Sequence, residues 1–252
     1  LAQAEGKEEV EFKEEKKTWG EIIKESPSDE ILNKIKITYG FLDKLLTFTF
    51  KHIFCFIFRL FWFLRIEGKE FIPENPPYIF CVNHASYLDG FLLCSSIPFH
   101  SAINIFFLGH AAIFEHPMVA WAIKVARLIS IDPATHLTEA MQACSFVLSH
   151  KKTICIFPEG NRSISQEIGD FKKGIGILAK ELDVPIIPVY IQGSHYAWPR
   201  GSKFPRPYPL KIIFGRAIHW QNLGDDYDTI AKGLREEVLK LSREGRFSSR
   251  LP

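Results

Sequence analysis

The stretch Tyr78-Ile-Phe-Cys-Val-Asn-His-Ala-Ser-Tyr-Leu-Asp89 joins a short apolar run to a polar turn. The run Tyr78–Val82 is followed directly by Asn83 and His84. A short apolar run that is bounded by polar residues is typical of a strand buried on both faces, as in a parallel sheet. We therefore expect a central strand, a polar turn carrying His84, and a helix beginning near Asp89.

Short apolar runs alternate with helical periods along the chain from residue 78. Strands are predicted at Tyr78–Val82, Ile103–Leu108, Leu128–Ile131, Thr153–Phe157, Ile186–Ile191 and Leu210–Phe214. Helices are predicted at Asp89–Ser95, Pro117–Ala126, Thr138–Ser149, Phe171–Leu182 and Tyr227–Glu244. Alternating strands and helices predict an α/β fold, in which a mixed, mostly parallel central sheet carries helices on both faces. We assign this domain to residues 67–252.

Composition excludes several classes of protein. The 252 residues carry a net charge of +2 and show no Lys/Arg cluster with interleaved aromatic residues, so no nucleic-acid partner is predicted. The five cysteines lie in apolar runs without the paired spacing of a zinc site, and we expect them to be reduced core residues in a cytosolic setting. The absence of a ligand cluster or a Walker-type loop predicts neither a metal nor a nucleotide cofactor.

The first forty residues form a charged leader, which we expect to be partly disordered. Trp19, Ile22 and Ile23 offer the alternative of a short docking helix. The leader lacks the apolar segment of a signal peptide. The chain begins with Leu1 instead of Met, which fits a processed product or a piece of a longer polypeptide.

Residues 41–66 are rich in Phe and apolar on almost every side of a helix. At 100° per residue, Lys44, Lys51, Arg59 and Arg65 fall within a sector of about 120°. A wide apolar face with a narrow cationic stripe predicts a helix in the membrane interface, peripheral or monotopic, at the cytoplasmic face of the cell membrane. One alternative is a transmembrane span, in which central cations cost about 2.5–3.5 kcal/mol each. The other is a helix buried by the domain.

His84 and Asp89 are separated by five positions, which on one continuous helix would point them about 140° apart. Across a strand-to-helix turn they can meet, with Asp89 as a helix cap. The carboxylate would then fix the imidazole tautomer and leave the other ring nitrogen as a base. The alternative is a pair that only caps the turn.

A second predicted strand ends in the polar turn Pro158-Glu159-Gly160. Gly160 permits a tight turn and the close approach of a ligand. Arg162 offers a bidentate fork for phosphate or carboxylate, with Glu159 available to orient it or to bind a polar headgroup. Lys172 and Lys173 follow where a helix is expected to begin, which favours an anion. The alternative is a solvated loop.

Four blocks of sequence carry a resemblance to a known family. They are N-H-A-S-Y-L-D at 83–89, F-P-E-G-N-R-S at 157–163, F-K-K-G at 171–174 and V-P-I-I-P-V at 184–189. In this order and spacing they resemble the signature blocks of the glycerolipid acyltransferases, which act on 1-acylglycerol-3-phosphate or lysophospholipids. The resemblance covers roughly residues 40–220. It implies a mixed α/β sheet and a membrane phospholipid surface as the place of action.

The resemblance also implies roles for particular residues. His84 would be the general base and Asp89 its partner. Substrate binding is implied for Asn83, Glu159, Gly160, Arg162, Ser163, Lys172 and Lys173. The reaction implied is transfer of a fatty acyl group from acyl-CoA or acyl carrier protein to the free hydroxyl of a lysophospholipid or 1-acylglycerol-3-phosphate, without a further cofactor. The alternatives are an inactive lipid-binding module and a different alcohol acceptor; a thioesterase or lipase is disfavoured because no G-x-S-x-G occurs.

Two departures from the family pattern bear on the acceptor. Many members carry an arginine after an Ile-Asp pair, where this chain has Pro133, and a lysine near Gly109-His110-Ala111, where it has none. The departures predict a lysophospholipid acceptor that retains its headgroup. The form Ile131-Asp132-Pro133 resembles acyltransferase halves that are fused to acyl-activating ligases, so such a ligase is an expected neighbour in a longer chain. Six further histidines and tryptophans are expected to have packing or interfacial roles instead of catalytic ones: His110, His116, His195, His219, Trp198 and Trp220. Of these, His110 could partly replace the missing lysine.

Overall fold

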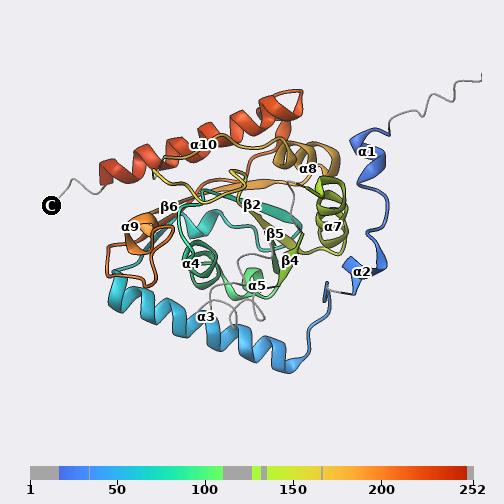
Figure 1. Ribbon diagram of the computed structural model, residues 1–252. Coiled ribbons are helices and arrows are strands. Elements are labelled where there is room, and N and C mark those ends of the chain that lie inside the picture. The colour runs from blue at the N-terminus through green and yellow to red at the C-terminus, as the bar shows by residue number, and fades with distance from the viewer. Residues whose placement is uncertain (1–16, 34, 110–126, 132–134, 166, 249–252) are drawn as a thin grey trace, which may run out of the picture.

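The computed structural model describes residues 17–33, 35–109, 127–131, 135–165 and 167–248 (Figure 1). Within them seven strands form one sheet in the order β1-β7-β6-β2-β5-β3-β4. The strands are β1 (Arg65–Glu67), β2 (Tyr78–Val82), β3 (Ile105–Gly109), β4 (Leu128–Ser130), β5 (Thr153–Ile156), β6 (Ile186–Gln192) and β7 (Lys211–Phe214). The helices are α1 (Trp19–Ile22), α2 (Asp29–Leu32), α3 (Phe41–Trp62), α4 (Asp89–Ser96), α5 (Phe99–Ala102), α7 (Leu137–Ser149), α8 (Gly174–Leu182), α9 (Ser194–Ala197) and α10 (Tyr227–Ser248).

The sheet is mixed and mostly parallel, as predicted. The pair β6–β7 is antiparallel, and the other neighbouring strands pair in parallel. All six predicted strands are present, with ends within two residues of the expected positions. Helix α8 begins at Gly174, three residues later than expected, because the preceding residues stay in a turn in which the Lys172 amide donates to the Pro158 carbonyl. The predicted helix Pro117–Ala126 lies outside the described residues.

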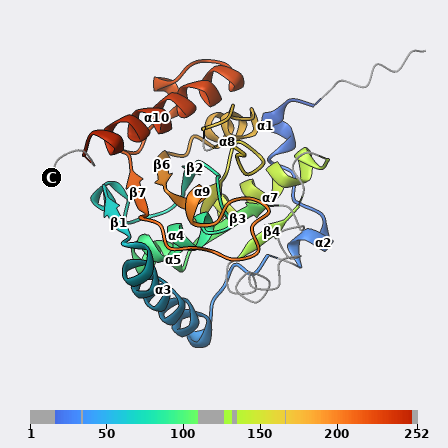
Figure 2. The same ribbon diagram turned by 60° about the vertical axis from the view of Figure 1, so that its left-hand side comes forward.

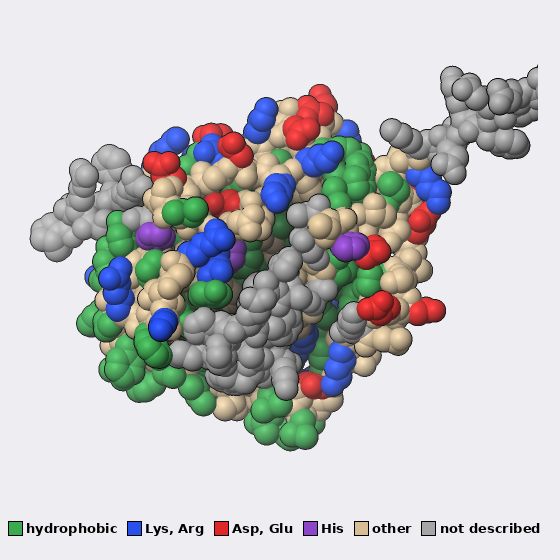
Figure 3. Space-filling model, viewed as in Figure 1, with side chains coloured by type: hydrophobic (Ala, Val, Ile, Leu, Met, Phe, Trp, Pro, Cys, Tyr) green, Lys and Arg blue, Asp and Glu red, His purple; other side chains and the backbone are tan. Residues whose placement is uncertain are grey.

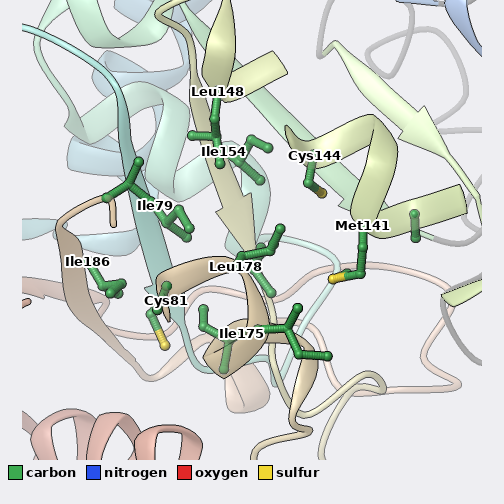
Figure 4. Close-up of a cluster of buried hydrophobic side chains, with 14 of the residues drawn as sticks. Ile79, Cys81, Met141, Cys144, Leu148, Ile154, Ile175, Leu178 and Ile186 are labelled. Carbon is green, nitrogen blue, oxygen red and sulfur yellow. The ribbon is translucent and has the colours of Figure 1, made fainter. Parts of the chain in front are cut away.

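Alternate side chains of β2 enter two separate apolar clusters. Ile79 and Cys81 point into a cluster covered by α7, α8 and α10 (Figure 4), whereas Tyr78, Phe80 and Val82 point into one covered by α3, α4 and α5. Figures 1 and 2 show α10 and α3 on opposite sides of the sheet. Because both faces of β2 are buried, the strand is apolar at every position. The prediction of helices on both faces is confirmed.

The described part of the leader packs against the domain. Ile23 and Ile31 are buried in the core, and the Gln142 side chain in α7 donates a hydrogen bond of 3.2 Å to the Ile22 carbonyl. The short docking helix is therefore present as α1. Residues 1–16 lie outside the described part of the chain.

Helix α3 ends four residues before the predicted boundary. Phe63 takes a left-handed conformation with φ 48°, and the amide of Leu64 donates to the Phe58 carbonyl. A left-handed residue at this position is a common helix stop. The next three residues, Arg65–Glu67, form the edge strand β1 beside β7, so the predicted helix over 63–66 is wrong.

Helix α3 has one face in the core and one exposed. Phe58 is buried, and the Phe54 ring stacks on Phe91 of α4 with centroids 5.6 Å apart. Lys51 is also buried against the domain, so the expected cationic stripe is not continuous at the surface. The outer face exposes large apolar side chains, namely Leu42, Leu45, Leu46, Ile53, Phe56, Leu60 and Phe61. Figure 3 shows apolar side chains gathered along the lower edge of the molecule, where α3 runs.

By length and composition α3 could cross a membrane, and only 17% of its most apolar 18-residue window is buried. This exposure does not fit the alternative of a helix enclosed by the domain. An exposed apolar face of this extent on a folded domain marks an interaction surface.

The packing of α8 on α10 predicts a strong effect of one methyl group. A Cβ at Gly176 would lie 2.2 Å from the Tyr227 carbonyl oxygen at the start of α10, whereas a Cβ at Gly174 would meet Met141 at 3.6 Å. We expect Gly176→Ala to lower the free energy of unfolding by about 1–3 kcal/mol. Gly174→Ala is the matched control and is expected to cost less. Urea denaturation of both variants measures this, and equal stabilities would contradict the close packing.

Candidate active site

The two polar turns of the sequence meet because their strands are neighbours. Strands β2 and β5 run in parallel, with Cys81 opposite Ile156, so their carboxyl ends lie at the same edge of the sheet. In open α/β sheets this edge is where ligands bind. His84 follows β2 and Glu159 follows β5, and the side chain of Glu159 reaches the backbone of His84.

His84 and Asp89 form the predicted pair. The His84 Nδ1 atom lies 2.9 Å from Asp89 Oδ2, and the Asp89 side chain is fully buried at the start of α4. The same Oδ2 accepts hydrogen bonds from the amides of Ala85 at 2.7 Å and Ser86 at 2.8 Å. A carboxylate in this position accepts the proton of Nδ1, so Nε2 carries the lone pair. The His84 side chain remains 15% exposed.

The loop after β5 holds His84 at three points. The Phe157 ring stacks on the imidazole with centroids 4.1 Å apart and planes 23° from parallel. The Glu159 Oε1 atom accepts from the His84 amide at 2.7 Å, and the Ser163 amide donates to the His84 carbonyl at 2.8 Å. Ring and backbone are therefore both fixed by residues from a separate turn.

Glu159 is occupied within the protein. Its second oxygen accepts from the Gly169 amide at 3.0 Å, and the Gly169 carbonyl in turn accepts from Arg235 of α10 at 2.8 Å. Burial raises the pKa of the Glu159 carboxyl, against the lowering effect of the two backbone hydrogen bonds. The expectation that Glu159 orients Arg162 is not met, because its two oxygens bind the amides of two loops.

Arg162 lies over an aromatic ring instead. Its guanidinium carbon is 3.6 Å from the centroid of Tyr87, and its NH1 atom is buried without a hydrogen-bond partner among the described residues. Gly160 has φ 76°, and a Cβ there would lie 2.5 Å from Lys172 Nζ. The glycine therefore lets the ammonium group pack over the turn. The turn thus gathers two cations, Arg162 and Lys172.

The other predicted binding residues differ in their positions. Asn83 is buried, and its amide group exchanges hydrogen bonds with the backbone of Ile191 in β6 at 2.7 and 3.1 Å. The side chain therefore joins two strands, and its role in substrate binding stays a prediction. The Ser163 hydroxyl donates to the Glu167 carbonyl. Lys173 is exposed at the N-cap of α8.

Sequence reasoning missed Phe157 and Tyr87 as parts of the site. Both lie within the quoted blocks, but ring stacking on His84 or under Arg162 has no signal in spacing. The expectation of packing roles holds for Trp198, which is buried, and for Trp220, which donates to Asp183. Residues 110, 116 and 133 lie outside the described part of the chain.

The site is thus a histidine–aspartate pair beside two cations, at the carboxyl edge of a helix-covered sheet. A family model for acyltransferases matches residues 63–192, slightly more than half of the chain. The chain belongs to the acyltransferase family.

Relatives carry more specific names. A chloroplastic 1-acyl-sn-glycerol-3-phosphate acyltransferase of Arabidopsis thaliana, LPAT1, is 26% identical over 71% of this chain and 49% of its own length. A 1-acyl-sn-glycerol-3-phosphate acyltransferase of Cocos nucifera is 31% identical over 62% of this chain and 51% of its own. The chain spans about half the length of these curated relatives.

A solved structure shares the fold. The crystal structure of the 1-acyl-sn-glycerophosphate acyltransferase PlsC from Thermotoga maritima superposes with a TM-score of 0.62. The superposition covers 88% of this chain and 89% of the PlsC chain, at 21% sequence identity. The arrangement of strands and helices is therefore that of this fold.

The buried position of Glu159 predicts a pH effect on stability. Because its pKa is raised in the folded state, the protonated form is favoured by folding, and this contribution is lost as pH rises through the folded-state pKa. Glu159→Gln cannot ionise. Its free energy of unfolding, relative to the wild type, should therefore rise as the pH increases above the ordinary glutamate pKa of about 4. Urea denaturation across this range measures the difference. Glu167→Gln, at an exposed neighbour, is the control; a flat difference for Glu159→Gln would contradict the raised pKa.

Proposed function

We propose that this chain is an O-acyltransferase that moves a fatty acyl group from a thioester of coenzyme A or acyl carrier protein to the free hydroxyl of a lysophospholipid. The acceptor class favoured by the names of its relatives is 1-acylglycerol-3-phosphate. The observation that carries the proposal is the bond from His84 to the buried carboxylate of Asp89, which leaves Nε2 available as a base.

In the proposed reaction Nε2 of His84 takes the proton of the acceptor hydroxyl as its oxygen attacks the thioester carbonyl carbon. The new C–O bond forms a tetrahedral intermediate, whose collapse breaks the C–S bond. The imidazolium then returns the proton to the leaving thiolate. Asp89 stabilises the positive charge on the ring between the two transfers, and base catalysis of this kind contributes about 10²–10⁴-fold.

Arg162 and Lys172 supply the positive charge expected for an anionic acceptor. The stack on Tyr87 holds the guanidinium plane in one orientation while its buried NH1 has no partner among the described residues. A guanidinium with a free edge suits one phosphate group. The intact pair and these cations argue against an inactive lipid-binding module. An acyl-activating ligase as a fused neighbour stays a prediction.

The proposed place of action is a phospholipid surface at the cytoplasmic face. The exposed face of α3 carries large apolar side chains from Leu42 to Phe61, while its inner face packs on α4. A helix of this kind lies in the plane of the interface with its apolar face among the acyl chains. An acceptor lipid then reaches the site from the same surface.

Removing the base should abolish acyl transfer without unfolding the protein. We expect His84→Ala to lower kcat by about 10²–10⁴-fold, and Asp89→Asn to be severely impaired because an amide cannot stabilise the imidazolium. His100→Ala, at an exposed histidine of α5, is the control. Release of free thiol measures the rate. If His84→Ala kept more than about a tenth of kcat, the general-base assignment would be wrong.

Pro133, which stands where many family members carry an arginine, favours a second class of acceptor lipid. With fewer cations at the site, a phosphodiester headgroup should compete with a dianionic phosphomonoester, so we expect acyl-glycerophosphoethanolamine to compete well with 1-acylglycerol-3-phosphate. The loss of one charge-assisted pair corresponds to roughly 1.5–3 kcal/mol, or tenfold or more in preference. Values of kcat/KM for the two acceptors decide this. A preference for the phosphomonoester of about a hundredfold would overturn the argument from Pro133.

The outer face of α3 should determine membrane binding. Replacing Leu45, Phe56 and Leu60 with Ser removes three exposed apolar anchors, each worth up to about 1.5–3 kcal/mol in the interface. We expect the variant to stay folded but no longer to co-sediment with vesicles. Phe58→Ser on the inner face should instead destabilise the fold. Vesicle binding that is unchanged by the triple substitution would exclude α3 as the anchor.

A further inference from the structure

The loop 199–209 lies beside the carboxyl end of α3. It joins α9 to β7, and Figure 1 shows it next to the last turn of α3. The Trp62 indole donates to the Arg206 carbonyl at 2.8 Å, and the Leu210 amide donates to the Trp62 carbonyl at 2.9 Å. The surface of this loop therefore continues that of the helix.

The loop is braced from within. The Arg206 amide donates to the Ala197 carbonyl at 2.8 Å, and its Nε donates to the Tyr196 carbonyl at 2.7 Å. The Trp198 indole donates to the Ser202 carbonyl at 3.0 Å. Four prolines between residues 199 and 209 further restrict the backbone. The tip is thus held in one conformation.

This braced tip exposes an aromatic residue among cations. The side chain of Phe204 is 70% exposed, and Tyr208 is 40% exposed. Arg200, Lys203 and Arg206 are exposed on the same loop, which contains no Asp or Glu. None of these three cations takes part in an ion pair in the part of the chain that the structure describes.

An exposed phenylalanine costs free energy in water, and three unpaired cations repel one another. Both costs are relieved at a bilayer that contains anionic phospholipids, where the ring enters the acyl region and the cations meet phosphates. We propose that the loop 199–209 is a second membrane-contact element, which inserts Phe204 and binds anionic phospholipid headgroups through Arg200 and Lys203. The proposal rests on the proposed function only in taking α3 to lie on the same bilayer.

The loop is also linked to the active site. The carbonyl of Trp198, directly before the loop, accepts from the Ser86 hydroxyl at 2.8 Å. The Trp198 ring lies 5.4 Å from the ring of Tyr87, on which Arg162 stacks. A bilayer that holds the loop is therefore held next to the turn that carries the histidine–aspartate pair.

Charge reversal tests the headgroup contact. The full chain is co-sedimented with vesicles of phosphatidylcholine alone or mixed with phosphatidylglycerol. Arg200→Glu/Lys203→Glu should reduce the partition onto the mixed vesicles by at least about tenfold. The double variant Lys24→Glu/Lys232→Glu makes the same change of charge at exposed residues outside the loop and should reduce it far less. Equal losses for the two double variants, or no loss for the first, would overturn the proposal.

Phe204→Trp tests insertion separately. With vesicles whose acyl chains are brominated, the added tryptophan should be quenched, whereas the tryptophan of Lys232→Trp on α10 should not. Equal quenching of the two would overturn the proposal. Both experiments measure binding alone, so they decide the matter even if acyl transfer fails. If transfer is found, the charge-reversal variant should keep its rate on acceptors in detergent micelles, because the loop contributes no group to the reaction.

Discussion

The carboxylate of Asp89 is the point on which the site depends. A fully buried carboxyl group needs hydrogen-bond partners, and one oxygen of Asp89 has three: the ring of His84 and the amides of Ala85 and Ser86. These bonds fix the turn between β2 and α4 in one conformation. The turn after β5 then holds His84 from the other side. The Glu159 carboxylate, the Ser163 amide and the Phe157 ring all contact His84.

The contacts around His84 also link the two helical layers that cover the sheet. Glu159 connects the backbone of His84 with Gly169, and Arg235 connects Gly169 with α10 on one face of the sheet. On the other face α4, which begins at Asp89, packs on α3. His84 is therefore positioned by both helical layers, although it lies on a short turn at the edge of the sheet.

Much of the fold and the pair at its centre could be predicted from the chain alone. The apolar runs predicted six strands, because buried parallel strands need apolar residues on both faces. The contact between His84 and Asp89 was predicted because a strand-to-helix turn can bring the two side chains together. The edge strand β1 could not be predicted, because three residues that follow a Phe-rich helix are too few to show the alternation of apolar and polar residues of a strand. The roles of Asn83 and Glu159 depend on amides that are distant in sequence, at Ile191 and Gly169, and no local pattern specifies those contacts.

Helix α3 belongs to the folded core as much as to the exterior. Phe58 is enclosed with the side chains of α4 and β2, and burial of such a side chain stabilises a fold by about 1.5–3 kcal/mol. A shortened protein that begins after Trp62, made to avoid detergent, would leave this layer of the core open to water. Solubility is better sought by exchanging the outward residues of the helix, because the helix cannot be removed without uncovering the part of the core that Phe58 fills.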